Sequence, residues 1–169
     1  MNYLMIVLRL IHIFSGVFWV GAALMLYFFI GPTVGATAEA GQRVMQHIIT
    51  RTRFTAAIAS AGGLTVLAGA ILYWLDSKGF TSAWMKTGAG IGLTLGSIFG
   101  LVGFISGIMV GRYTTTIGKV GSQIQGQPTA EQITQITTAQ KQLAVVSPIQ
   151  SISLILAVLL MASARYFMF

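Results

Sequence analysis

Four long stretches of this chain contain no Asp, Glu, Lys or Arg, and this feature constrains the fold more than any other. A helix needs about 20 mostly apolar residues to cross the hydrocarbon core of a bilayer, and each stretch supplies that length. The sequence therefore predicts an integral membrane protein. The stretches lie between Arg9 and Glu39, Arg53 and Asp76, Lys86 and Arg112, and Lys141 and Arg165.

The apolar stretches predict helices rather than β-strands. Only helices and closed barrels satisfy their backbone hydrogen bonds in lipid, and these runs do not alternate apolar with polar residues as barrel strands do. We predict an all-α fold, a polytopic membrane four-helix bundle that forms a single domain over residues 1–169. The four spans are expected at about 3–30, 54–75, 84–110 and 144–168.

Composition excludes several other classes of protein. Only 8% of the residues are charged, against about 25% in soluble domains, so the chain cannot cover a surface that faces water. The net charge is +7, but the basic residues are scattered over connections and helix ends. Such residues are typical of topology signals and of contacts with anionic lipid, so we predict no nucleic-acid binding. The chain has no Cys, which excludes disulfides and thiolate metal sites.

The connections predict further helices outside the spans. Gly31 and Pro32 predict the end of the first helix. Thr37 is a candidate cap for a helix over 38–52 that continues into the second span, and Thr129 opens a helix that enters the fourth span. We therefore expect cytoplasmic helical extensions of the second and fourth helices.

Basic residues also predict the orientation. The side of the membrane that is richer in Lys and Arg is cytoplasmic, so both termini are predicted on the outer side of the cell inner (plasma) membrane. Six basic residues lie on the richer side and four on the other: Arg43, Arg51, Arg53, Arg112, Lys119 and Lys141 against Arg9, Lys78, Lys86 and Arg165.

His12 is the residue that most suggests chemistry. An ionisable side chain inside a span is costly and usually faces the bundle interior, and neutral imidazole is a good ligand for haem iron. Arg9, Gly16 and Trp19 share the helix face of His12 by their spacing, and Gly16 leaves room for a flat macrocycle. The pattern favours a haem b site, and the alternatives are a site for another metal or a proton relay, or a histidine that only hydrogen-bonds a neighbouring helix.

Other residues are candidates for the rest of that site. Met161 lies at the depth of His12 and is a candidate second axial ligand. Arg9, Lys86 and Arg165 are candidates for pairing with haem propionates, a quinone carbonyl or an anionic substrate, unless they contact lipid headgroups. His47 lies on the opposite side of the membrane and is expected to be exposed.

The third span contains a ladder of small residues. Glycines at spacings of four allow membrane helices to approach closely, within the bundle or across a homodimer or larger complex. Within the bundle, the expected neighbour is the second span, because it also contains small residues, among them Gly62 and Gly69. The ladder comprises Gly88, Gly92, Gly96, Gly100, Gly103, Gly107 and Gly111.

Two short motifs carry a family resemblance. His12, Trp19 and Gly21 lie close together in the first span, and Trp84 and Lys86 open the third. This pattern, with Gly31-Pro32, resembles small bacterial membrane proteins of the CopD family and, more distantly, HemJ-type protoporphyrinogen oxidases. The resemblance implies a haem b protein with functional roles for His12 and Lys86.

Three hypotheses of function follow. The first is a haem b redox protein, which would be an oxidoreductase, that exchanges electrons with a quinone, a tetrapyrrole such as porphyrinogen, or a partner protein. The second is a copper-handling protein with Met and His ligands. The third is a non-catalytic accessory or scaffolding subunit. Two histidines and three acidic residues do not supply a hydrolase or kinase site.

Overall fold

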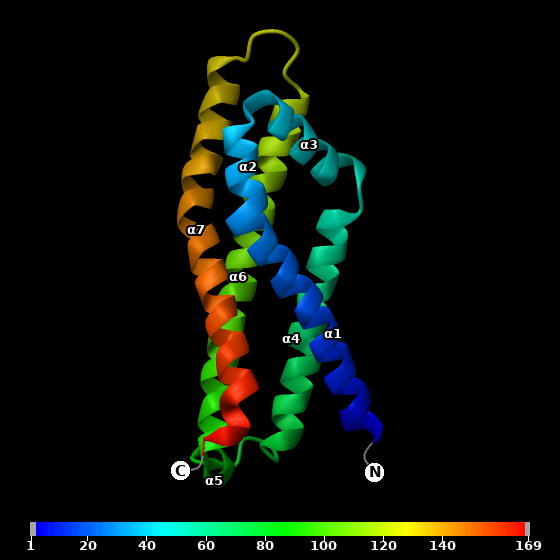
Figure 1. Ribbon diagram of the computed structural model, residues 1–169, viewed down its shortest axis with the longest axis vertical. Coiled ribbons are helices and arrows are strands. Elements are labelled where there is room, and N and C mark those ends of the chain that lie inside the picture. Colours follow the sequence, from blue (N-terminus) through cyan, green and yellow to red (C-terminus); the bar gives the residue numbers. More distant parts are fainter. Residues whose placement is uncertain (1–2, 168–169) are drawn as a thin grey trace.

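The computed structural model describes residues 3–167, and these residues form helices almost throughout, with no strand among them (Figure 1). The predicted all-α fold is therefore confirmed. The helices in chain order are α1 (Tyr3–Met25), the π-helix η1 (Leu26–Ile30), α2 (Gly31–Ala36), α3 (Ala38–Arg51), α4 (Phe54–Asp76), α5 (Ser82–Met85), α6 (Gly88–Ser122), α7 (Ala130–Ser163) and the 3-10 helix η2 (Ala164–Tyr166).

Four helical segments are long and apolar enough to cross a membrane, as the sequence predicts. They are Tyr3–Ala36, Phe54–Asp76, Gly88–Ser122 and Ala130–Tyr166. The beginning of α1 and the end of α7 lie at the same end of the molecule, together with the connection through α5 (Figure 1). The chain thus has the layout of a multi-pass membrane protein with an even number of spans.

The four long helices form two pairs. α6 and α7 run side by side along their whole length, whereas α1 crosses α4 obliquely (Figure 1). Trp19 of α1, which is 4% exposed, packs edge to face against Phe104 of α6 with ring centroids 5.8 Å apart. Tyr73 of α4 shares a 2.6 Å hydrogen bond with the hydroxyl of Thr94 of α6. These two contacts help to join the pairs.

The glycine ladder of α6 packs against α7, so the predicted close packing within the bundle is confirmed. A Cβ on Gly96 would lie 2.7 Å from Cγ of Met161, and a Cβ on Gly103 would lie 2.7 Å from Cδ2 of Leu154. The expected neighbour was wrong, because the ladder faces the fourth span and not the second. Since α7 of the same chain covers most of the ladder, this face is not available for a homodimer.

Gly31 and Pro32 do not end the first helix, contrary to the prediction. The chain passes through the π-helical turn η1 and continues as α2 to Ala36. Pro32 lies in the first turn of α2 and has no N–H to donate to the preceding π turn. The wider π turn gives Gly31 N–H a partner in the carbonyl of Leu26.

The helix predicted over 38–52 is confirmed as α3, but it is not continuous with the second span. Thr52 takes an extended conformation, and α4 begins anew at Phe54. Thr37 does not cap α3, because its hydroxyl donates to the carbonyl of Thr33 at 2.7 Å. The expected extension of the second helix is therefore a separate helix.

The extension of the fourth helix is confirmed, and the third helix has one that the sequence did not predict. Thr129 caps α7 through a reciprocal pair of hydrogen bonds with Gln132. α6 continues beyond the predicted end at residue 110 to Ser122. The two extensions run together as an antiparallel hairpin (Figure 1).

Candidate functional site

His12 lies half-buried in α1 and contacts α4. Its Nδ1 is 2.8 Å from the backbone carbonyl oxygen of Thr65. A carbonyl oxygen only accepts hydrogen bonds, so Nδ1–H is the donor. In the neutral ring this leaves the lone pair on Nε2, which is the nitrogen free to bind a metal.

Gly69 makes this contact possible. A Cβ on Gly69 would lie 2.8 Å from Cε1 and 2.9 Å from Nδ1 of His12, closer than real Cβ contacts allow. Gly69 follows Thr65 by one helical turn, so its bare backbone opens the route to the Thr65 carbonyl. From the sequence, Gly69 was predicted only as a packing residue, and this role was missed.

Ser15 and Thr65 extend the polar contact between α1 and α4. The hydroxyls of Ser15 and Thr65 are 3.0 Å apart, and both residues are buried. Ser15 also donates to the carbonyl of Ile11 in its own helix. Thr65 therefore meets α1 twice, with its carbonyl at His12 and its hydroxyl at Ser15. Ser15 and Thr65 are each an isolated polar residue in an apolar stretch, and this pattern in the sequence could have indicated a polar contact between the two helices.

Gly16 and Trp19 lie on the face of His12, as predicted, but helices fill the space beside them. A Cβ on Gly16 would lie 3.4 Å from Cγ2 of Thr65, so Gly16 serves close packing with α4 and does not leave room there for a macrocycle. Trp19 packs between Gly62 and Phe104 as a core residue.

Met161 does not join His12 in this conformation. Its side chain packs on Gly96 and Gly100, in the contact between α6 and α7. The His12 side chain instead packs in the contact between its own helix α1 and α4. Within residues 3–167, no group of three or more His, Cys, Asp or Glu side chains is placed to hold a metal ion.

The three candidate cations have separate surroundings. Arg9 pairs with Asp76 at 3.7 Å, and both residues lie at the end of the α1–α4 pair. Arg165 lies over the ring of Tyr166, 4.7 Å from its centroid. Lys86 is exposed between α5 and α6. Of these, only Arg9 lies within one turn of His12 along α1.

His47, the second histidine, is exposed on α3, as predicted.

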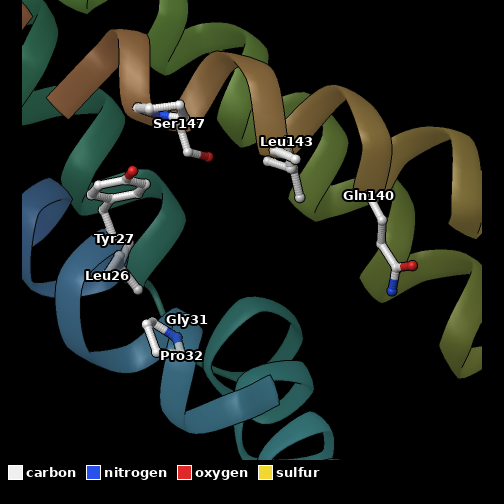
Figure 2. A pocket seen from close by; sticks show the side chains of 9 residues that line it. Leu26, Tyr27, Gly31, Pro32, Gln140, Leu143 and Ser147 are labelled. Atoms are coloured by element: carbon white, nitrogen blue, oxygen red, sulfur yellow. The ribbon is translucent and has the colours of Figure 1, made fainter. Parts of the chain in front are cut away.

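Two hollows lie away from His12. The first, of about 380 Å³, is a shallow, open hollow lined by η1, α2 and α7 (Figure 2). It is mostly apolar, and its polar side chains are Tyr27, Gln140 and Ser147. The second, of about 370 Å³, lies where α3, α4 and α6 meet. Neither is lined by His12.

The contact with α4 fixes the orientation of the His12 ring and leaves Nε2 as the nitrogen available for binding. Arg9 lies one helical turn before it on α1. Comparison of the chain with protein-family models, curated proteins and solved structures finds no match.

Proposed function

We propose that this chain is a membrane haem b protein that exchanges electrons with a partner, and that His12 would hold the haem iron through Nε2. The observation that carries the proposal is the 2.8 Å contact from His12 Nδ1 to the Thr65 carbonyl. Metal-binding histidines commonly donate their other ring N–H to a carbonyl or carboxylate, which fixes the tautomer and the ring orientation. A bound haem supplies one-electron chemistry.

The residues around His12 support one ligand to the haem iron and one charge partner for a haem propionate. Thr65 and Gly69 of α4 hold the imidazole at a fixed angle. Arg9 lies one turn before His12, and its side chain is 59% exposed, so its guanidinium is accessible to a propionate carboxylate. Met161, Gly16, Lys86 and Arg165 are not assigned to the site in this packing. We further propose that the chain resides in a bacterial inner membrane, with a quinone or tetrapyrrole as redox partner.

The same contacts favour a second candidate, a non-catalytic membrane subunit. His12, Ser15 and Thr65 bond to one another or to nearby backbone, so the α1–α4 pair is satisfied without a cofactor. In that case His12 holds two helices together and the protein contributes surface to a larger complex.

An absorption spectrum separates the two candidates. The protein is expressed in haem-replete cells and purified in detergent, and bound haem is quantified as the pyridine haemochrome. The haem proposal expects a Soret band in the unmodified chain and in His47→Ala, whose histidine is exposed on α3. It expects no band in His12→Ala that still elutes as a folded species. A colourless unmodified protein, or full haem content in His12→Ala, contradicts it.

A further inference from the structure

The hollow between α3, α4 and α6 combines polar side chains from three helices. Its lining is Ile49 and Thr50 of α3, Thr55 of α4, and Thr115 and Lys119 of α6. Ile49 also packs on Gly118, where a Cβ would lie 3.4 Å from Cγ2 of the isoleucine. This contact holds α3 against α6 and shapes one wall of the hollow.

Two of the threonine hydroxyls in the hollow are available to a ligand. Most helical threonines here, such as Thr50, donate to the carbonyl four residues earlier. The hydroxyls of Thr55 and Thr115 make no hydrogen bond with any residue in the range 3–167. Thr55 also lies in the first turn of α4, which begins at Phe54. The positive end of the helix dipole lies there, although the N–H of Phe54 is already bonded to the hydroxyl of Thr52 at 3.2 Å.

The positive charge of Lys119 is not neutralised by any side chain in the described part of the chain. Arg51 and Arg53, at the end of α3 and the start of α4, are also exposed and basic. The three acidic residues of the chain are engaged elsewhere: Glu39 with Arg43 at 2.9 Å, Asp76 with Arg9 at 3.7 Å, and Glu131 with Gln135 at 3.2 Å. The hollow therefore suits an anion.

The level of the hollow along the spans identifies the source of that anion. The charge-free stretch of α4 begins after Arg53, and that of α6 ends at Arg112. Thr55 and Thr115 lie within three residues of these limits, where hydrocarbon gives way to headgroups. Basic residues at this level are attracted to anionic lipids.

We propose that this hollow binds the phosphodiester group of an anionic phospholipid. Lys119 pairs with the phosphate charge, and the hydroxyls of Thr55 and Thr115 donate to phosphate oxygens. Charge-assisted hydrogen bonds to phosphate are about twice as strong as neutral ones, so the site favours a headgroup whose phosphate charge is not offset by a cation of its own, as choline offsets it in phosphatidylcholine. The proposal does not depend on the haem proposal.

Lipid binding to the full chain in detergent tests the proposal. The delipidated protein is titrated with phosphatidylglycerol, phosphatidylcholine or inorganic phosphate, and bound lipid is counted by native mass spectrometry. We expect preferential binding of phosphatidylglycerol, weakened about tenfold in Lys119→Gln, in line with the loss of one charge-assisted bond. The matched control is Lys141→Gln, because Lys141 is exposed on the same side and lies outside the hollow.

A second variant guards against a misfolded first one. Thr55→Val with Thr115→Val keeps the shape and the charge of the hollow and removes both free hydroxyls, so it is expected to weaken phosphatidylglycerol binding severalfold. Thermal unfolding in detergent verifies that each variant is folded. Equal binding of the two lipids, unchanged binding in both variants, or displacement of phosphatidylglycerol by millimolar inorganic phosphate overturns the assignment to a lipid.

Discussion

The imidazole of His12 lies against the bare Cα of Gly69, at a distance that no residue with a Cβ allows without displacement. This relationship links the only histidine of the first span to a glycine of the second. It also decides whether His12 reaches the Thr65 carbonyl, because a side chain at position 69 occupies the path of the ring.

Gly69→Ala is expected to push the His12 ring away and break the Nδ1 hydrogen bond. Overpacking of this kind costs about 1–3 kcal/mol of unfolding free energy. Thermal unfolding in detergent measures it. Gly63→Ala is the matched control on the same helix, since no described atom outside its own helical turn lies within 4 Å of a Cβ there. Equal stability of the two variants would contradict the contact between His12 and Gly69.

Ser15 and Thr65 are expected to be coupled. A double-mutant cycle with Ser15→Ala and Thr65→Val isolates the bond between their hydroxyls. Hydrogen bonds between membrane helices contribute about 0.6 kcal/mol on average and up to about 1.7 kcal/mol, and a coupling energy in that range is expected. Strictly additive effects of the two substitutions would show that the hydroxyls do not meet.

Gly103→Ala is expected to separate α6 from α7. The new methyl group would lie 2.7 Å from the side chain of Leu154, which is 1% exposed and has no room to move. We expect a loss of about 1–3 kcal/mol, and Gly111→Ala, a position with open space around it, is the control. Since the chain has no native Cys, a pair of introduced cysteines carrying spin labels also reports the change in helix separation.

Thr129→Ala is expected to loosen the beginning of α7. The substitution removes the hydroxyl that accepts from Gln132 N–H at 3.2 Å, and loss of such a cap costs about 1 kcal/mol. Amide hydrogen exchange over residues 130–137 should accelerate about fivefold for that cost. Thr138→Ala in the same helix lacks a capping role and should leave the exchange unchanged; acceleration in both would point to a general loosening of α7.

Single cysteines test the predicted orientation. Ala83→Cys in α5 and Gln125→Cys between α6 and α7 place exposed thiols at opposite ends of the molecule. If both termini face outward, a membrane-impermeant maleimide labels Ala83→Cys in intact cells and reaches Gln125→Cys only after lysis. The reverse pattern places the termini inside.

The sequence predicted the fold better than it predicted the site. The charge-free stretches located all four spans, because charged side chains are costly in lipid and a long stretch without them is visible in the sequence itself. Gly31 and Pro32 do not end the helix because a π turn before the proline lets the helix continue. This depends on local backbone geometry, which the composition does not reveal. The helix that packs on the α6 glycines was also misassigned. The spacing shows that one face of α6 consists of small residues, but it does not show which helix packs against that face.

The site illustrates the same limit. The position of His12 and its face were readable from spacing, but its contact with Thr65 joins residues 53 positions apart. Met161 matched His12 in depth along the spans, yet depth does not fix the direction of a side chain, and Met161 faces α6.

The unequal lengths of the helices have a consequence of their own. α6 has 35 residues and α4 has 23, so α6 is longer by about 18 Å at 1.5 Å per residue. The end of α6 beyond Lys119 and the polar first part of α7 extend past the level of the lipid headgroups on the side away from the termini. Proteases and antibodies added to that side can therefore reach the segment around Gly126 without disturbing the spans.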